Sequence, residues 1–172
     1  MKKALIILDV QRGFVSDKDQ NQLQIIENLI GIFKKNRWPV IAFQHVDSHP
    51  QSPIQKGTHG AEIVDFVKEN SDLIIEKKYP IAYKETKLQK ILQHHEVEEI
   101  YIVGFNMEFC VLFTAIASAD RGYKVTVVED GCGTVNDNQT YEMEGLDIVD
   151  FVGSVLDWSE VIKDVYYEEL EF

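Results

Sequence analysis

The sequence has only two cysteines and no long run of apolar residues. A membrane-spanning helix needs about 20 consecutive apolar residues, and no segment meets that requirement. The apolar run that follows Met1-Lys2-Lys3 ends after five residues at Asp9, and no small-residue cleavage site follows, so the pattern is not that of a signal peptide. We therefore expect a cytoplasmic protein, in which a disulfide between Cys110 and Cys132 is not favoured.

Positive charge is also scarce. The chain has 17 Lys and Arg residues against 29 Asp and Glu residues, which gives a formal net charge of −12. Nucleic acids and anionic membrane surfaces attract clustered Lys and Arg, so neither is expected as a partner. Internal repeats, low-complexity tracts and linkers are absent as well. We therefore expect one domain over residues 1–172, which is long enough to bury a full hydrophobic core.

Strand-like and helix-like segments alternate along the chain. The expected strands cover residues 4–8, 40–43, 73–75, 99–103, 125–128 and 149–156, and the expected helices cover 23–33, 61–68, 86–95, 109–121, 138–146 and the residues from about Ser159 onward. Because these strands are almost continuously hydrophobic, they indicate a parallel sheet covered by helices on both faces, which is a three-layer α/β/α fold. Open sheets of this kind bind ligands at the carboxyl ends of their strands.

Reactive side chains follow three of these strands. Asp9 comes after the first strand, Lys77 and Lys78 come after the third, and Cys110 comes shortly after the fourth. Each has an ordinary interpretation, as a turn-forming acid, a solvated pair of amines and a small core residue. However, the carboxyl ends of parallel strands meet at one edge of the sheet, so all three positions are expected together, which favours a functional site.

The chemistry of this group is that of nucleophilic catalysis. A thiol in the first turn of a helix has its thiolate stabilised by the helix dipole and by free backbone N–H groups, and a nearby lysine adds to this effect. A carboxylate such as Asp9 can accept the thiol proton as a general base. Backbone N–H groups between Gly104 and Cys110 can hold the oxyanion that forms during acyl transfer. These residues predict acyl transfer through a cysteine nucleophile.

The same strand ends lie in three longer segments, LILDVQRGF, IEKKYPIAY and VGFNMEFCVLFTAIASADRGYKVTVVEDG. In this order they resemble the motifs of the isochorismatase-like cysteine hydrolases, and the similarity runs over nearly the whole chain. The resemblance implies a six-stranded, mainly parallel sheet in the order 3-2-1-4-5-6. It also implies a catalytic triad of Asp9, Lys77 and Cys110, because counting back from Ala82-Tyr83 selects Lys77 rather than Lys78. A homodimer or a larger homo-oligomer is the expected assembly.

The resemblance also assigns residues around the triad. It implies a cis peptide bond between Phe105 and Asn106, upstream of the nucleophile. The backbone amides of Asn106 and Cys110 are then the expected oxyanion donors. Such donors stabilise the negative oxygen of a tetrahedral intermediate.

The substrate pocket is expected around Phe14, Tyr83, Ile81 and Met107. Two of these residues depart from the family pattern, because Met107 stands where Thr is frequent and Ile81 replaces a small polar residue. Both changes make the expected pocket bulkier or more apolar. The substrate of a named relative is therefore not transferred to this chain.

The loop around Asp47-Ser48-His49-Pro50 resembles the start of the zinc site of nicotinamidases. Asp47, His49 and His59 together make an acceptable zinc ligand set. The longer insertion of those enzymes is missing, however, and family members without metal carry a His nearer the position of His45. We expect a polar loop and no cofactor, with zinc as the alternative. Cys132, after the fifth strand, is expected to be a packed thiol.

The residues and the resemblance together predict a hydrolase that acts on a small molecule. We expect it to cleave the C–N bond of an amide or ureido group through a thioester on Cys110, with Asp9 as the base and Lys77 assisting. One alternative is an isochorismate-type enol-ether hydrolase, a reaction that needs the Asp and the Lys but no thiol. The other alternative is a non-catalytic member of the family that binds a small molecule.

Overall fold

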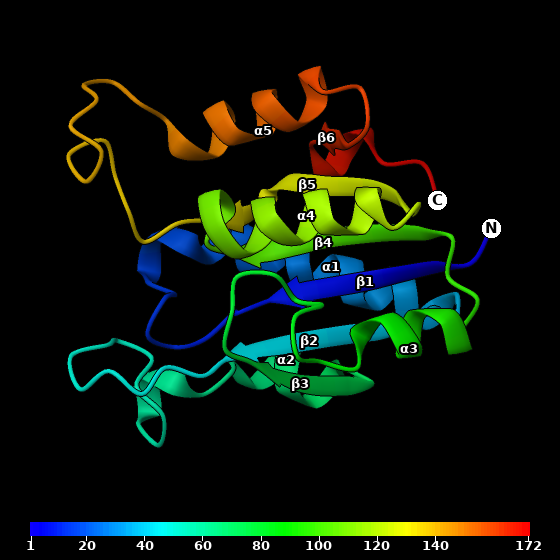
Figure 1. Ribbon diagram of the computed structural model, residues 1–172, viewed down its shortest axis with the longest axis horizontal. Coiled ribbons are helices and arrows are strands. Elements are labelled where there is room, and N and C mark those ends of the chain that lie inside the picture. The colour runs from blue at the N-terminus through cyan, green and yellow to red at the C-terminus, as the bar shows by residue number, and fades with distance from the viewer.

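Six parallel strands form the centre of the protein in the computed structural model, which describes residues 1–172 (Figure 1). They lie in the order β3-β2-β1-β4-β5-β6, and every neighbouring pair is parallel. The strands are β1 (Lys3–Leu8), β2 (Val40–His45), β3 (Leu73–Lys77), β4 (Glu99–Phe105), β5 (Lys124–Gly133) and β6 (Lys163–Val165). The predicted fold class and strand order are confirmed.

Helices cover both faces of this sheet (Figure 1). One face carries α1 (Gln20–Lys35) and α2 (Asp65–Asn70), and the other carries α3 (Leu88–His94), α4 (Leu112–Asp120) and α5 (Ile148–Trp158). A single π-helical turn, η3 (Met107–Val111), precedes α4. No helix has the length and apolar character that a membrane crossing requires.

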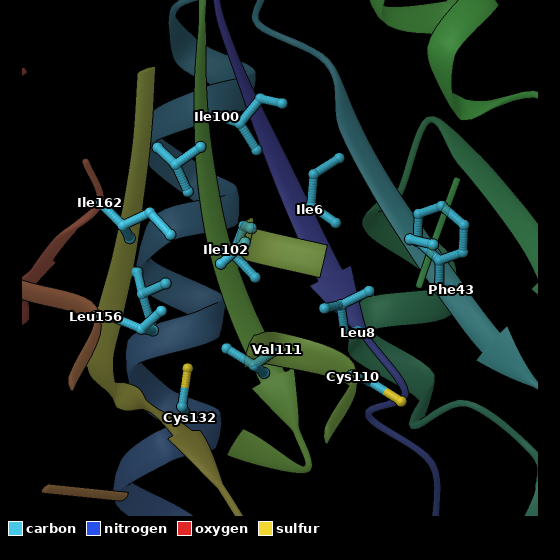
Figure 2. Packing of buried hydrophobic residues seen from close by; sticks show 14 of the residues in the cluster. Ile6, Leu8, Phe43, Ile100, Ile102, Cys110, Val111, Cys132, Leu156 and Ile162 are labelled. Atoms are coloured by element: carbon cyan, nitrogen blue, oxygen red, sulfur yellow. The ribbon is translucent and has the colours of Figure 1, made fainter. Parts of the chain in front are cut away.

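Strand β1 shows why the strands are apolar throughout. Successive side chains of a strand point to opposite faces. Ala4, Ile6 and Leu8 pack in the cluster under α3, α4 and α5, whereas Leu5 and Ile7 pack in the cluster under α1 and α2. Figure 2 shows Ile6 and Leu8 within the first of these clusters. Because both faces are covered, neither set of side chains needs to be polar.

The expected strand at residues 149–156 is wrong, because these residues lie in α5. The Asp147 carboxylate caps this helix by accepting hydrogen bonds from the backbone amides of Val149 and Asp150. Val152 and Leu156 then face the core at a spacing of four residues. A short apolar run rich in valine has no period that separates a strand from a helix, and the cap was the missed signal.

Two further expectations near the carboxyl end are corrected. The helix expected from Ser159 is instead the edge strand β6, followed by a short 3-10 turn at Tyr167–Glu169. The helix expected at residues 138–146 is a series of turns, in which Asp137 accepts hydrogen bonds from the backbone amides of Gln139 and Thr140. Asp side chains that bond nearby backbone groups in this way favour turns over helices.

The ends of β1 and β4 come unusually close together. Leu8 is paired with Gly104, whose φ is +123°, and a Cβ on Gly104 would lie 2.0 Å from the carbonyl oxygen of Leu8. Only glycine fits both this backbone conformation and this close approach. The contact brings the residue after β1, Asp9, next to the turn after β4 that carries Cys110.

Candidate active site

Asp9 follows directly after β1 and is fully buried. Its backbone has a φ of +53°, a left-handed conformation that Asp tolerates better than most residues. Its amide donates to the carbonyl oxygen of Phe43 (3.1 Å), and its carbonyl oxygen accepts from the amide of Gln11 (2.8 Å). This tight turn leaves the carboxylate inside the protein at the edge where β1, β2 and β3 end.

Lys77 is the last residue of β3, and its side chain has no exposed surface. β2 lies between β3 and β1, and the long Lys77 side chain reaches past it to Asp9. Its Nζ donates to Oδ2 of Asp9 (2.6 Å), to Nδ1 of His45 (3.0 Å) and to Sγ of Cys110 (3.1 Å). An ammonium has three N–H donors, so each of them has an acceptor.

Cys110 lies in the turn η3, before α4, and is only 6% exposed. Burial raises the pKa of its thiol to about 12, and the negative charge of Asp9 adds to the rise while Lys77 opposes it. The expectation that the helix and the lysine would favour the thiolate is therefore corrected. The loss of hydration on burial outweighs the opposing effect of Lys77, and the thiol keeps its proton at neutral pH.

His45 is a member of this group to which the sequence assigned no role. It is the last residue of β2 and is paired directly with Lys77 of β3. Burial, followed by the positive charge of Lys77, lowers its pKa, so its ring is neutral and can accept a hydrogen bond from the ammonium. Its place at the carboxyl end of a parallel strand was the signal that could have identified it.

Gln11 holds the backbone of His45 in place. The Gln11 Oε1 accepts from the amide of His45 (2.8 Å), and its Nε2 donates to the carbonyl oxygens of His45 (3.1 Å) and Ala61 (2.8 Å). Gln11 is fully buried. The Gln of the LILDVQRGF segment thus ties the end of β1 to the end of β2.

The turn between β4 and the nucleophile has the expected cis peptide bond between Phe105 and Asn106. The backbone N–H of Asn106 donates to no acceptor within the chain, whereas its side-chain Oδ1 accepts from the amide of Val135 (2.9 Å). The Asn106 amide is thus available to an oxygen atom of a ligand. Its role as an oxyanion donor, together with that of the Cys110 amide, stays a prediction.

Glu108 connects this turn to the loop after β5. Its Oε1 accepts hydrogen bonds from Asn136 Nδ2 (2.7 Å), Thr134 Oγ1 (2.8 Å) and the Tyr141 hydroxyl (3.1 Å). Three donors on one oxygen hold the loop against the residues that precede Cys110. No local sequence pattern singles out Glu108, because its partners lie 26 or more residues away along the chain.

The residues expected to line the pocket are not all near the nucleophile. Tyr83 hydrogen-bonds Ser118 through its hydroxyl (2.9 Å), and its ring packs under the guanidinium of Arg121. Ser118 lies near the end of α4 and Arg121 directly follows that helix, about two to three helical turns from Cys110. Tyr83 is buried in the core, and its role as a pocket residue stays a prediction. Met107 is fully buried.

Ile81 and Phe14 are both partly buried, but they pack on opposite faces of the sheet. Ile81 packs against the cluster that contains Cys110, whereas Phe14 packs against the cluster under α1 and α2. Their roles as pocket residues stay predictions.

A cavity of about 800 Å³ lies beside Cys132 and Gly133, and none of Asp9, Lys77 and Cys110 lines it. Cys132 itself is buried, and burial raises the pKa of its thiol well above the usual value. Figure 2 shows Cys110 beside the end of β1 and Cys132 apart from it on β5. The expectation of a packed thiol at Cys132 agrees with this position.

Asp47, His49 and His59 do not form a converging set of metal ligands. The Asp47 carboxylate accepts from the backbone amide of His49 (2.8 Å), and the exposed His59 ring pairs with Glu62 (3.0 Å). The group whose potential ligand atoms all lie within 4.8 Å of one another is Asp9, His45 and Cys110. The Lys77 ammonium hydrogen-bonds all three of these side chains. Because Asp47 and His59 each bond another group of the loop region and do not converge, the loop residues do not fit the zinc set.

A family model, curated relatives and solved structures all match this chain. The family model described as the isochorismatase domain matches residues 3–160. An uncharacterised isochorismatase family protein of Bacillus subtilis is 30% identical over 149 residues, which cover 81% of this chain and 80% of that protein. The nicotinamidase of Saccharomyces cerevisiae is 30% identical over 99 residues, covering 48% of this chain and 46% of that enzyme. The crystal structure of N-carbamoylsarcosine amidase from Thermoplasma acidophilum shares the fold, with a TM-score of 0.79, 20% identity and full coverage of both chains.

Proposed function

The chain belongs to the isochorismatase family of hydrolases, and from this premise we propose that it cleaves the C–N bond of a small amide or ureido compound through a thioester on Cys110. The observation that carries the proposal is the position of Lys77, whose Nζ lies 2.6 Å from Asp9 and 3.1 Å from Cys110. A base, a cation and a thiol are thereby held together in a buried position. The names of the nicotinamidase and the N-carbamoylsarcosine amidase support an amide or ureido substrate.

The first requirement is removal of the thiol proton, because the raised pKa of Cys110 keeps it protonated at neutral pH. Asp9 is the base in reach, and its Oδ1 is buried without a hydrogen-bond partner in the chain. Oδ2 is held by Lys77, so Oδ1 is free to accept the proton. The Lys77 ammonium then lies beside the sulfur and compensates the negative charge that develops on it.

In the acylation half of the reaction, the Cys110 sulfur attacks the substrate carbonyl carbon as its proton passes to Asp9. The carbonyl oxygen becomes an oxyanion that accepts hydrogen bonds from the backbone amides of Asn106 and Cys110. When the tetrahedral intermediate collapses, the C–N bond breaks and Asp9 returns the proton to the departing nitrogen. Ammonia or an amine leaves, and the acyl group remains on the sulfur as a thioester.

In the second half, a water molecule replaces the departed amine. Asp9 accepts one of its protons while the oxygen attacks the thioester carbonyl carbon. The C–S bond breaks, the sulfur regains a proton from Asp9, and a carboxylic or carbamic acid leaves. Asp9 thus acts as base and acid in turn, and Lys77 holds the Asp9 carboxylate in place throughout.

The distribution of arginine disfavours the enol-ether alternative, whose substrate is a dicarboxylate. Arg12 pairs with Glu62 and Asp65, and Arg121 packs on Tyr83 at the far end of α4. Arg37 lines a cavity beside Trp38, at the opposite edge of the sheet. No guanidinium is therefore in position to bind carboxylates at Cys110, as a bidentate clamp requires.

A substrate panel tests the proposal. Nicotinamide, an N-carbamoyl amino acid and isochorismate are incubated with the wild-type protein, Cys110→Ala and Asp9→Asn, and ammonia and pyruvate release are measured. We expect ammonia release by the wild type and a loss of at least about a thousandfold in both variants. A mass increase on Cys110 after rapid acid quenching would identify the thioester.

Two outcomes contradict the proposal. If pyruvate is released from isochorismate and Cys110→Ala retains that activity, the reaction is enol-ether hydrolysis without a thiol nucleophile. If the wild type turns over none of the panel and Cys110 carries no acyl group, the protein is a non-catalytic binder.

A further inference from the structure

Glu108 is an acidic residue in the turn η3, two residues before Cys110, and it is partly buried. No Lys, Arg or His side chain forms an ion pair with it. Its Oε2 is buried without a hydrogen-bond partner in the chain. Native proteins contain few such atoms, and each of them requires an explanation. The proposed reaction has no step for this carboxylate, so its role must follow from the contacts of its other oxygen.

That other oxygen, Oε1, binds the loop that follows β5. The Asn136 amide group, the Thr134 hydroxyl and the Tyr141 hydroxyl all donate hydrogen bonds to it. The Thr134 oxygen in turn accepts a hydrogen bond from the backbone amide of Asn136 (3.1 Å). Hydrogen bonds to an ionised acceptor are about twice as strong as those between neutral groups. One carboxylate oxygen thus holds three side chains of the loop, which lie 26 to 33 residues further along the chain.

A second contact joins the same two segments. Oδ1 of Asn106, the residue that precedes η3, accepts a hydrogen bond from the backbone amide of Val135 in the same loop (2.9 Å). Asn106 and Glu108 lie on either side of Met107, which is fully buried. The loop after β5 therefore binds the turn at two positions, through one amide side chain and one carboxylate.

The turn held in this way carries the expected oxyanion donors. The Asn106 carbonyl oxygen accepts from the backbone amides of Phe109 (3.0 Å) and Val111 (3.3 Å), whereas the Asn106 N–H donates to no acceptor within the chain. These local bonds belong to a π-helical turn, a rare conformation that occurs mostly as single turns at functional sites. Reactive groups keep a productive position only where surrounding hydrogen bonds hold them. The contacts of Glu108 and Asn106 with the loop supply such support.

We propose that Glu108 is a positioning residue, which fixes the turn so that the backbone amides of Asn106 and Cys110 lie where the oxyanion forms. The inference rests on the proposed function, because acyl transfer is the reaction that forms this oxyanion. A displacement of about 1 Å at a reacting group can cost about a hundredfold in rate. The Cys110 sulfur has a separate support, since Lys77 of β3 donates a hydrogen bond to it (3.1 Å). Loss of Glu108 should therefore slow reactions at a carbonyl group and spare the reactivity of the thiol.

Two reagents that modify Cys110 separate these effects. p-Nitrophenyl acetate transfers its acetyl group to the sulfur through a tetrahedral oxyanion, and p-nitrophenolate leaves with the bonding electrons. Iodoacetamide is attacked at a saturated carbon, iodide leaves, and no oxyanion forms. In Glu108→Ala at pH 8, we expect the acetylation of Cys110 to slow by about ten- to a hundredfold, whereas its alkylation should change by less than about twofold. Peptide mass spectrometry measures both rates at Cys110.

Three further variants support the comparison. Glu144→Ala is the matched control, because Glu144 is an exposed acid of the same region, and both of its rates should equal those of the wild type. Glu108→Gln keeps an acceptor oxygen and should restore part of the acetylation rate. Tyr141→Phe removes one donor and should slow acetylation less than Glu108→Ala does, with no additional effect when the two are combined, because both changes break the same hydrogen bond. Circular dichroism verifies folding, and if Glu108→Ala does not fold, Glu108→Gln and Tyr141→Phe must still slow acetylation without slowing alkylation.

The proposal is overturned if Glu108→Ala slows acetylation and alkylation equally, because the carboxylate would then act on the sulfur or on the fold as a whole. It is also overturned if neither rate changes. A wild type whose Cys110 is alkylated but never acetylated would contradict the proposed function, and the role of Glu108 would fail with it. A wild type that is acetylated as fast as Glu108→Ala would contradict the role of Glu108 alone.

Discussion

Oδ2 of Asp9 and Nζ of Lys77 lie 2.6 Å apart, although 68 residues separate them in the chain and neither side chain is exposed. Two charges so far from water stabilise a fold only through each other. The pair is therefore a structural requirement of this edge of the sheet as well as the centre of the proposed mechanism. Loss of one partner and loss of both should have different consequences.

Replacing Lys77 by Met should lower the free energy of unfolding by about 3–5 kcal/mol, because the Asp9 carboxylate is left buried without a counter-charge. The double variant Asp9→Asn with Lys77→Met should recover part of this loss. Urea denaturation measures all three proteins. Lys78→Met is the control, because Lys78 is exposed, and it should change stability by less than about 0.5 kcal/mol. Equal losses in the single and double variants would contradict the pairing.

Alkylation of Cys110 by iodoacetamide should respond to pH differently from that of a free thiol. The labelling rate of an ordinary cysteine levels off once the pH exceeds the pKa of its thiol, which is about 8.5. Burial raises the pKa of Cys110 to about 12, with Asp9 adding to the rise, so its rate should be low at pH 7 and still increase beyond pH 9. In Asp9→Asn the neighbouring charge is gone, and labelling at pH 8 should be faster. Peptide mass spectrometry separates Cys110 from Cys132, and a plateau near pH 8 for Cys110 would refute the prediction.

Replacing His45 by Leu should lower kcat by roughly ten- to a hundredfold with little change in KM. The Lys77 ammonium then loses one hydrogen-bond acceptor, and a hydrogen bond from a charged group contributes about 1.5–3 kcal/mol to holding the ammonium in place. His45→Gln offers an oxygen in its place and should restore part of the rate. Because the pKa of His45 is lowered, its ring stays neutral in mildly acidic solution, and wild-type kcat should persist at pH 6. The pH profile of both variants is the measurement, and a purely structural role would alter stability without moving kcat.

The close approach of β1 and β4 predicts that Gly104→Ala destabilises the protein by about 3 kcal/mol or more, because the new Cβ would lie 2.0 Å from the carbonyl oxygen of Leu8. Gly122→Ala is the matched control. Gly122 also has a positive φ, but open space surrounds its Cβ position, so the cost should be only about 1–2 kcal/mol. Thermal unfolding of both variants compares the two effects, and similar losses would show that the clash is relieved.

Asp164 and Glu129 form a carboxyl pair beneath Gly153 of α5, where a Cβ would lie 2.4 Å from Asp164 Oδ2 and 2.3 Å from Glu129 Oε2. Burial, the hydrogen bond with Glu129 and its charge raise the pKa of Asp164 to about 9. Between pH 4 and 9 the unfolded chain releases this proton while the folded chain keeps it, so wild-type stability falls as pH rises through this window.

Asp164→Asn has no proton to release, so its stability relative to the wild type should increase from pH 5 to pH 8. Urea denaturation at both pH values measures the difference. Glu69→Gln, at an exposed position without a hydrogen bond from its side chain, provides a control that should show no such trend. A difference that is the same at pH 5 and pH 8 would mean that the pair does not share a proton.

Much of the fold could be predicted from local patterns. The apolar run at Ala4–Leu8 and its counterparts indicated buried parallel strands, because a strand covered on both faces has no polar side. The failures lie where local patterns are ambiguous. Residues 149–156 have the composition of a strand, yet they form a helix because Asp147 caps them and their apolar side chains meet the core at a helical spacing.

The sequence alone established that Asp9, Lys77 and Cys110 share one edge of a parallel sheet, since each follows a strand and such strands end together. Only the folded chain revealed that His45 joins them and that the Cys110 thiol is buried enough to keep its proton. The reason is physical: periodicity and strand order follow from neighbouring residues, whereas burial and three-way hydrogen bonding depend on atoms that distant segments bring together.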